Sequence, residues 1–531
     1  MNPAVAYLAQ RSRSPIAGLD LLLILLFAAL VRLALYNGAF GSDDLVYFER
    51  AAQLARGEWT SANYNGALRY GFNLPAGGLI ALFGESVFVA NLWPLVCSLI
   101  EIGAAFAFAN AAMNRRAGVF AAMLLATAPL HIAVATRIHA DPVVSMFVTV
   151  AFALLYFGTS RNRPWLLFAA GLSTGGVFWA KELAAVTWFA FLPMLWFFRG
   201  QSRNCVYFLV GGIVMMMLHG VLMVALTGDP FHLATVVLGA LKRNFIDGAQ
   251  GEDGATYYLR YLFLDLRHTG ALAFFAVAAL VWVPQWLNQK GQSRVGFSFL
   301  VVWWFGLLLV LSVFPVSLSP LRFTMKQSNY ITLFLAPTAL MAGMAMAALP
   351  RSVGQAALAI CIALGLFLGA LQQADYRVFT ANTKALADFA VQHPHDVIVG
   401  STNNSALGNL WGRLLHPTTP KAAIVAFRDL TDTANGTSQL MSGANEIFAV
   451  IDKQTLNWFA GNAPIAQPLP CWQHELTLEP SDLSWGNRLA ATASVALAPL
   501  KLLAVSLNRL AKPERADVYR ITGRDLMCGT H

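Results

Sequence analysis

Charged and polar residues able to do chemistry gather in four short clusters, and the first of them is acidic. It contains Asp43 and Asp44 side by side, with Ser42 before them and Tyr47 one turn later. Ser42 or Asp43 could cap a helix that begins here, and Asp44 would be favourable in its first turn. Capping explains one of these residues and leaves a second adjacent carboxylate unexplained. Paired carboxylates suit general-base catalysis or metal-assisted chemistry.

The second cluster combines a cation, an imidazole and a carboxylate, because Arg137, His139 and Asp141 lie within five residues. Pro142 follows Asp141, and proline is favoured at the first position of a helix, so Asp141 has an alternative role as a helix cap. Arg137 and His139 beside it still form a compact acid and base group.

The third and fourth clusters supply cations. Lys181 and Glu182 are embedded in apolar sequence, where a charge at the centre of a spanning helix costs about 2.5–3.5 kcal/mol. Mutual pairing is their structural explanation; the functional one is that Lys181 meets a phosphate and Glu182 orients it. Arg322 and Lys326 precede Tyr330, and they could bind an anionic head group or extend to the membrane surface.

Three further polar residues are left outside the site. Glu101 lies inside a predicted span, where a carboxylate is a functional candidate by default, but it can be protonated or hydrogen-bonded to Ser98 or Asn110. His131 and His219 are lone histidines on apolar segments. No histidine-rich zinc spacing accompanies them.

The elements that position these clusters are membrane spans. Of the 531 residues, 57% are hydrophobic and only 12% are charged, about half of the roughly 25% in a soluble domain. This composition excludes a purely soluble protein and a disordered chain. The 41 glycines have no triplet period and the cysteines number five, which excludes collagen and a disulfide scaffold. The net charge of +9 comes mostly from bases between apolar runs, so nucleic acid is not an expected partner.

Eleven apolar runs are long enough to cross a bilayer, which needs about 20 residues. The first, Leu19–Tyr36, is nearly unbroken. The others lie at about 87–113, 117–136, 142–159, 164–180, 183–199, 205–227, 270–288, 297–316, 329–349 and 354–371.

Basic residues in alternate short connections predict the orientation of these spans. By the positive-inside rule those connections and the N-terminus are cytoplasmic. The long connections 37–86 and 228–269, with helices on the membrane surface, and the chain after 374 are then extracytoplasmic. The basic connections contain Arg115 and Arg116, Arg161 and Arg163, Arg199 and Arg203, Lys290 and Arg294, and Arg351.

Residues 1–374 are predicted to form the transmembrane catalytic domain and residues 375–531 a soluble α/β domain of a usual size. In the second domain Asn, Asp, Thr and Pro return and short β-like runs appear. These runs are 397–400, 422–427 and 447–451.

The cysteines and one ambiguous apolar stretch bear on the layout of the tail. Leu489–Leu510 is interrupted by Pro499 and Lys501, so we expect an interfacial helix rather than a twelfth span. Cys471 and Cys528 can then form a disulfide outside the cytoplasm. The other three cysteines fall in or at the ends of spans, where a thiol acts as a small hydrophobe: Cys97, Cys205 and Cys361.

The first cluster resembles a known signature. The pattern Asp43-Asp44-x-x-Tyr47-x-x-x-Ala51-x-x-Leu54-x-x-Gly57 is similar to the acidic motif of the GT-C fold glycosyltransferases, within them the bacterial protein O-mannosyltransferase and aminoarabinose lipid A transferase group (glycosyltransferase families 39 and 83). The resemblance covers roughly residues 15–350, and later landmarks follow in order. These are Ala128-Pro129 with Arg137 and Asp141, the stretch Gly171–Lys181, and a polar turn leading to Tyr330 and Pro337.

The resemblance implies a polyprenyl-phosphate sugar donor, an inverting reaction on the outer membrane face and a monomer in the bacterial inner membrane. One first-loop Asp would act as general base, with Asp43 favoured over Asp44 as the first of the pair. The acceptor would be lipid A, another envelope glycan or a protein. No cofactor is certain, and a divalent metal at Asp43 and Asp44 is an open alternative. One departure is Asn329, where many members carry Arg before the Tyr.

The chemistry of the four clusters and the family resemblance together suggest a role for each candidate residue. Catalytic candidates are Asp43, Asp44 and Asp141. Candidate ligands of the donor phosphate are Arg137, Lys181, Arg322 and Lys326, since cations must stabilise the leaving phosphate. Candidate substrate-binding residues are Tyr47, Arg69, Tyr70, His139, Glu182 and Tyr330.

Two other classes of function compete with an enzyme. A transporter or flippase of a lipid-linked or anionic solute should place polar residues and broken helices near mid-membrane, whereas the charges here gather at one face. A structural or assembly factor acting through the tail would not need the first-loop carboxylates. The chain has no Walker A loop, so ATP-driven transport is not supported.

Overall fold

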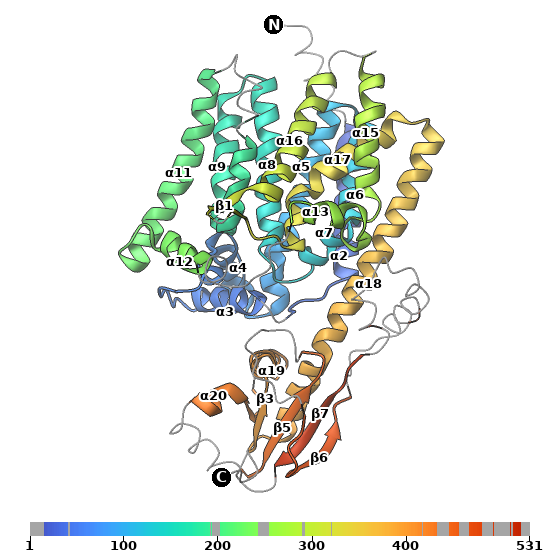
Figure 1. Cartoon of the computed structure of the whole chain (residues 1–531). Coiled ribbons are helices and arrows are strands. Elements are labelled where there is room, and N and C mark those ends of the chain that lie inside the picture. Colours follow the sequence, from blue (N-terminus) through green and yellow to red (C-terminus); the bar gives the residue numbers. More distant parts are fainter. Residues whose placement is uncertain are drawn as a thin grey trace. The chain divides into compact units, whose positions relative to one another are not determined.

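The chain forms two compact units (Figure 1). The first contains the residues up to Gly38 and Val46–Ala370; the second contains Ala39–Leu45 and the residues from Leu371 onward. The predicted domain boundary at 374/375 lies four residues from this division. The computed structural model describes residues 15–40, 43–191, 193, 202–242, 254–288, 293–319, 321–416, 418–432, 445–455, 467–479, 492, 510 and 513–521.

Within the described residues, seven helices are long and apolar enough to cross a membrane. They confirm the predicted helical membrane fold, and each overlaps one predicted span. The helices are α2 (Pro15–Ala34), α5 (Val87–Ala112), α8 (Asp141–Ser160), α11 (Ser202–Thr227), α16 (Ser293–Val313), α17 (Thr332–Ala348) and α18 (Arg351–Gln392).

The other four predicted spans are also helical but shorter or bent. The run 117–136 is the helix pair α6 (Arg115–Thr127) and α7 (Pro129–Ala135), which bends by 60°. Pro129 lacks the amide needed to continue α6, and Ala128 before it has an extended backbone. The remaining three runs are α9 (Pro164–Ala180), the 3₁₀ helix η2 (Glu182–Phe191) and α15 (Leu272–Leu287).

The two long connections contain short helices, and a hairpin precedes α17. The first connection has α3 (Asp43–Ala55), η1 (Asn65–Leu68) and α4 (Tyr70–Phe83). The second has α12 (His232–Leu241), α13 (Tyr257–Phe263) and α14 (Leu266–Thr269). The hairpin is β1 (Pro315–Leu318) with β2 (Leu321–Phe323), followed by η5 (Ser328–Ile331).

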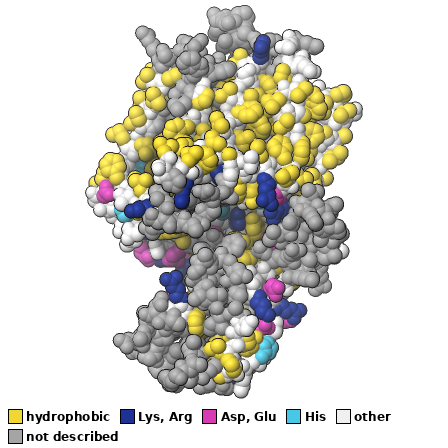
Figure 2. Space-filling model, viewed as in Figure 1, with side chains coloured by type: hydrophobic (Ala, Val, Ile, Leu, Met, Phe, Trp, Pro, Cys, Tyr) yellow, Lys and Arg dark blue, Asp and Glu magenta, His cyan; other side chains and the backbone are white. Residues whose placement is uncertain are grey.

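Apolar side chains face outward as well as inward in the helical unit. Figure 2 shows hydrophobic side chains over most of its described surface on the face in view, and Leu30, Leu82 and Val221 are among the exposed ones. In contrast, α17 is buried along its length from Thr332 to Met346. A wide apolar outer surface is what a membrane-embedded unit presents to lipid.

Helices α9 and α11 pack with their backbones in close approach. A Cβ atom on Gly171 would overlap the carbonyl oxygen of Phe208, and one on Gly211 would overlap the carbonyl oxygen of Phe168. Small residues at helix interfaces allow such packing in membranes. Because α9 ends directly before Lys181 and Glu182, the packing of α9 against α11 helps to fix the position of these two residues.

We expect Gly171→Ala to destabilise the protein by about 1–3 kcal/mol, because the added methyl group forces α9 and α11 apart. The measurement is the midpoint of thermal unfolding of the purified protein in detergent. Gly103→Ala on α5 is the matched control, since a Cβ there meets no atom within 4 Å. Equal unfolding midpoints for the two variants would contradict this account of the interface.

The second unit is built on one five-stranded sheet with the order β4-β3-β5-β7-β6. Strands β3, β4 and β5 are parallel, and β7 and β6 are antiparallel to their neighbours. The strands are β3 (Val397–Gly400), β4 (Ala423–Ala426), β5 (Ile447–Asp452), β6 (Trp472–Thr477) and β7 (Ala516–Ile521), with α19 (Thr402–Leu415) and α20 (Phe427–Asp432) between them.

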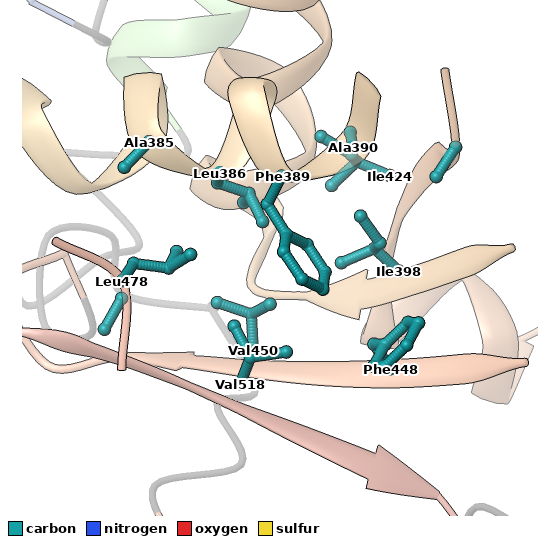
Figure 3. Packing of buried hydrophobic residues seen from close by; sticks show 12 residues of the cluster. Ala385, Leu386, Phe389, Ala390, Ile398, Ile424, Phe448, Val450, Leu478 and Val518 are labelled. Carbon is teal, nitrogen blue, oxygen red and sulfur yellow. The ribbon is translucent and has the colours of Figure 1, made fainter. Parts of the chain in front are cut away.

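The C-terminal half of α18 covers one face of this sheet. Figure 3 shows Leu386 and Phe389 of α18 packed against Ile398, Phe448 and Val518 of the strands. Alternate residues of the same strands form a second buried cluster, which includes Val397, Val399, Ile447 and Ile451. Both faces of the central strands β3 and β5 are therefore buried, and the three predicted β-like runs are confirmed as β3, β4 and β5.

The cysteines of the predicted spans are free thiols, whereas Cys471 in the second unit is not. Cys97, Cys205 and Cys361 are free thiols, and the first and last of them are buried. Cys471 is disulfide-bonded. Cys528 lies outside the described residues, so its pairing with Cys471 stays a prediction. Nearly all of the stretch Leu489–Leu510 also lies outside the described residues.

Candidate active site

A buried ion pair joins the second and third clusters of the sequence. Lys181 Nζ donates to Asp141 Oδ1 at 2.8 Å, and the two side chains are only 6% and 2% exposed. Asp141 is the first residue of α8, while Lys181 directly follows the last turn of α9. The pair therefore fastens the ends of two adjacent helices.

Three more side chains complete this group, which we call the Asp141 cluster: Asp141, Lys181, His139, Asn329 and Tyr330. Asn329 Nδ2 donates to Asp141 Oδ2 at 2.6 Å, and His139 Nδ1 lies 3.0 Å from the same oxygen. The Tyr330 ring lies beneath Lys181, with its centroid 4.4 Å from Nζ. Burial lowers the pKa of His139, although Asp141 acts in the opposite direction. The imidazole is therefore neutral near pH 7.

A second buried ion pair lies one residue further along the chain. Arg69 donates through Nε and one terminal nitrogen to the two oxygens of Glu182, both at 3.0 Å. Asn65 Nδ2 donates to Glu182 at 2.9 Å, and Arg69 also donates to the Tyr47 hydroxyl. Such a two-pronged contact fixes the position of both planar groups. It connects α3, η1, the start of α4 and η2.

Local backbone geometry explains why Lys181 and Glu182 have different partners. Lys181 is extended, with φ −162° and ψ 107°, and successive side chains along an extended backbone point to opposite sides. The structural alternative, in which the two side chains pair with each other, is wrong: Lys181 pairs with Asp141, and Glu182 pairs with Arg69.

A glycine brings the second pair together. A Cβ atom on Gly71 would lie 2.8 Å from the backbone nitrogen of Ala180, closer than real Cβ atoms come. Only glycine therefore lets the start of α4 approach the end of α9. Trp93 Nε1 donates to the carbonyl oxygen of Gly71 at 3.0 Å and holds the contact from α5. Arg69 and Glu182 flank this point.

Asp141 is not a helix cap. The cap position of α8 belongs to Ala140 and has no side-chain hydrogen bond, whereas Pro142 occupies the first turn as expected. The capping alternative is therefore wrong, because the Asp141 carboxylate is occupied by Lys181 and Asn329.

The other predicted residues of the first unit lie on neighbouring segments. Tyr70 accepts a hydrogen bond from Arg50 at 3.1 Å. Arg137 is buried, and its backbone pairs with Gly38 next to the end of α2. Lys326 is buried with Nζ 5.2 Å from the Phe323 ring centroid.

The last of the cationic candidates, Arg322, lies on β2 opposite Ser317 of β1. The hairpin therefore carries one of the predicted phosphate ligands just before the chain reaches Lys326 and η5.

The first-loop carboxylates belong to the second unit. Asp43 and Asp44 open α3, and the Asp44 carboxylate accepts a hydrogen bond from the Phe40 backbone amide. Asp44 is 3% exposed, whereas Asp43 is partly exposed. The Phe40 ring stacks on Phe379 of α18 with ring centroids 4.6 Å apart. Asp44 thus shapes the turn that leads into α3.

Within the part of the chain that the structure describes, no group of three or more His, Cys, Asp or Glu side chains is placed to hold a metal ion. A divalent ion at Asp43 and Asp44 stays a prediction.

Sequence reasoning missed two partners of the buried ion pairs. Asn65 was not singled out, and Asn329 was noted only as a departure from the resemblance. A buried Glu182 needs donors beyond one cation, so an Asn on a loop that returns to the site was a usable signal. The sequence alone does not show which loop returns.

Comparisons with known proteins agree with this architecture. Residues 74–224 match the family model of dolichyl-phosphate-mannose-protein mannosyltransferases. The crystal structure of ArnT from Cupriavidus metallidurans in the apo state superposes with a TM-score of 0.55 at 16% identity, covering 96% of this chain and 98% of that one. The chain therefore has the GT-C membrane fold of ArnT.

Two further structures share the GT-C fold. ArnT bound to undecaprenyl phosphate also has a TM-score of 0.55 at 16% identity, covering 94% of this chain and 97% of that one. The oligosaccharyltransferase AglB from Archaeoglobus fulgidus, in complex with an inhibitory peptide and a dolichol-phosphate, has a TM-score of 0.50 at 12% identity and covers 83% and 70%. None of the curated protein sequences matches the chain significantly.

Proposed function

We propose that this protein is an inverting glycosyltransferase that moves a sugar from a polyprenyl-phosphate donor to an acceptor outside the cytoplasm. The GT-C fold supports the proposal, as does the undecaprenyl phosphate bound by the ArnT relative. The observation that carries it is the Asp141 cluster, in which a buried lysine is held at a helix end between a carboxylate and an aromatic ring.

The ammonium group of Lys181 suits a phosphate ligand. It has three N–H donors; one is used on Asp141, and the Tyr330 ring faces the group from another side. A donor therefore remains for a phosphate oxygen. A compact cation held in a buried site stabilises charge that develops on a leaving group far more than it would in water. Arg137, Arg322 and Lys326 are the further cations that we assign to the phosphate.

The reaction balances without a cofactor. An acceptor hydroxyl or amine attacks the anomeric carbon and forms the new glycosidic bond. Its proton goes to Asp43, while the bond from that carbon to the phosphate oxygen breaks and the lipid phosphate leaves with the electron pair. Attack opposite the leaving group inverts the configuration. Asp43 is the base that we favour, because it is partly exposed whereas Asp44 is buried.

Asn329 gives the departure from the family pattern a specific role. Its amide donates to Asp141 at 2.6 Å, so it completes the coordination of the carboxylate that holds Lys181. An Arg in this position would bring a second cation. In this chain we assign the phosphate to Lys181, and Asn329 supports it through Asp141.

The proposal places the protein in the bacterial inner membrane with its site facing the periplasm. The acceptor would be lipid A, another envelope glycan or a protein, and the second unit would help to present it.

The proposal is tested by incubating the purified protein in proteoliposomes with radiolabelled undecaprenyl-phosphate sugars and envelope extract. We expect label to pass to an acceptor and undecaprenyl phosphate to be released in equal amounts. Movement of labelled lipid across the bilayer without release of undecaprenyl phosphate would instead identify a transporter.

A further inference from the structure

A series of buried, hydrogen-bonded polar side chains connects α2, α7 and α5 in the helical unit. Arg32 of α2 is fully buried and one of its terminal nitrogens lies 2.6 Å from His131 Nδ1 on α7. His131 Nε2 lies 3.2 Å from Glu101 Oε2 on α5. Arg32 Nε also donates to the Ser98 hydroxyl at 2.8 Å. Glu101 and His131, which the sequence left outside the site, are therefore members of one network with Arg32.

The direction of these hydrogen bonds follows from the arginine. A guanidinium has donors only and stays charged, so His131 Nδ1 accepts and its proton is on Nε2. Nε2–H then donates to Glu101. A neutral imidazole thus bridges Arg32 and Glu101, and the charges of the two balance across it. Breaking such a buried pair is costly.

The other oxygen of Glu101 faces α8. Ser145 Oγ donates to it at 2.6 Å and Thr149 Oγ1 at 3.0 Å. These residues lie one and two turns after Asp141, or about 6 and 12 Å along the helix. Both are buried, at 1% and 0% exposure.

Only one of these two hydroxyls has a described contact beyond Glu101. The single Ser145 hydroxyl proton is shared in a three-centre hydrogen bond, because the carbonyl oxygen of Thr332, at the start of α17, accepts from the same Oγ at 2.8 Å. The Thr332 hydroxyl donates to the carbonyl oxygen of Asn329 at 2.7 Å. Asn329 in turn donates to Asp141. The contacts form a ring from Asp141 along one turn of α8 to Ser145, across to Thr332, and back through Asn329.

We infer that Glu101, acting through Ser145, is a positioning residue for the Asp141 cluster. The inference rests on the proposed function, since the cluster is assigned there to the donor phosphate. Glu101 orients the Ser145 hydroxyl, Ser145 holds the junction of η5 and α17 against α8, and that junction carries Asn329 and Tyr330. Arg32 and His131 fix the Glu101 carboxylate from the opposite side. The network sets the geometry in which Lys181 meets its ligand and touches no substrate.

A matched pair of variants tests the inference in the full-length protein in proteoliposomes. Ser145→Ala removes the hydroxyl that reaches both Glu101 and Thr332. Thr149→Val removes a hydroxyl that reaches the same Glu101 oxygen, with no change in size. Each variant loses a hydrogen bond to Glu101, and Ser145→Ala loses the contact with Thr332 as well. Activities are therefore compared well below the unfolding midpoints of both variants.

We expect Ser145→Ala to lower kcat for sugar transfer about tenfold, the effect of a small displacement of a positioned group, with the KM for the acceptor unchanged. Thr149→Val should keep kcat within twofold. Hydrogen–deuterium exchange followed by mass spectrometry should show faster exchange of residues 328–333 in Ser145→Ala alone.

Equal kcat values and equal exchange in the two variants would overturn the inference while leaving the proposed function intact. If the parent protein transfers no sugar, the proposed function fails, and the exchange of residues 328–333 still decides whether Ser145 holds this junction.

Discussion

Asp43→Asn should lower the rate of sugar transfer at least about a hundredfold, whereas Asp44→Asn should lower it no more than about tenfold. A general base contributes about 10²- to 10⁴-fold to a rate, and asparagine cannot take the acceptor's proton. An asparagine at position 44 still has a side-chain oxygen that can accept a hydrogen bond from the Phe40 backbone amide, as the Asp44 carboxylate does. The turn into α3 should therefore survive. The measurement is kcat with labelled donor lipid, and we expect Asp44→Asn to stay within about tenfold of the parent protein.

Two controls make this test of the base specific. Asp44→Ala removes the acceptor for the Phe40 amide and should lose more activity and stability than Asp44→Asn. Thermal unfolding of Asp43→Asn should match that of the parent protein. An inactive Asp44→Asn beside an active Asp43→Asn would transfer the role of base to Asp44, and two active single variants with an active double variant would refute the mechanism.

Hydropathy and charge were sufficient to predict the membrane fold, because a helix that crosses lipid needs about 20 predominantly apolar residues. Every predicted span contains a helix, and the break between α6 and α7 follows from Pro129. In contrast, β6 was not predicted, since residues 473–475 in its middle are polar and exposed. Its pairing with β7 depends on residues some 40 positions away.

Residue types could be chosen from the sequence, but partners could not. Lys181 and Glu182 were both singled out, yet adjacency along the chain suggested a mutual pair. The real partners come from α8 and from the turn before α4, and the approach at Gly71 has no signal in the local pattern. Glu101 and His131 were set aside as lone residues for the same reason, because Arg32 and Ser145 reach them from other helices.

Substitutions in the Lys181–Asp141 ion pair should give the second large loss of activity. Lys181→Met should lower kcat about 10²- to 10³-fold, the loss seen when one stabilising donor is removed from an active site. Asp141→Asn should cost about tenfold, because an asparagine oxygen can still accept from Lys181 although the carboxylate charge is lost. Lys181→Arg should fail to rescue activity, since a planar guanidinium does not reproduce a point charge between Asp141 and the Tyr330 ring.

The double variant decides what Asp141 does. If Asp141 acts only by holding Lys181, then Asp141→Asn has no further effect on kcat in the Lys181→Met background, and the two changes are strongly non-additive. If the losses multiply, Asp141 has a role of its own, such as the catalytic one that its sequence context suggested. The contacts favour the first outcome, because Lys181 and Asn329 each occupy one oxygen of the Asp141 carboxylate and His139 lies beside the second, which leaves a poor base for an acceptor proton.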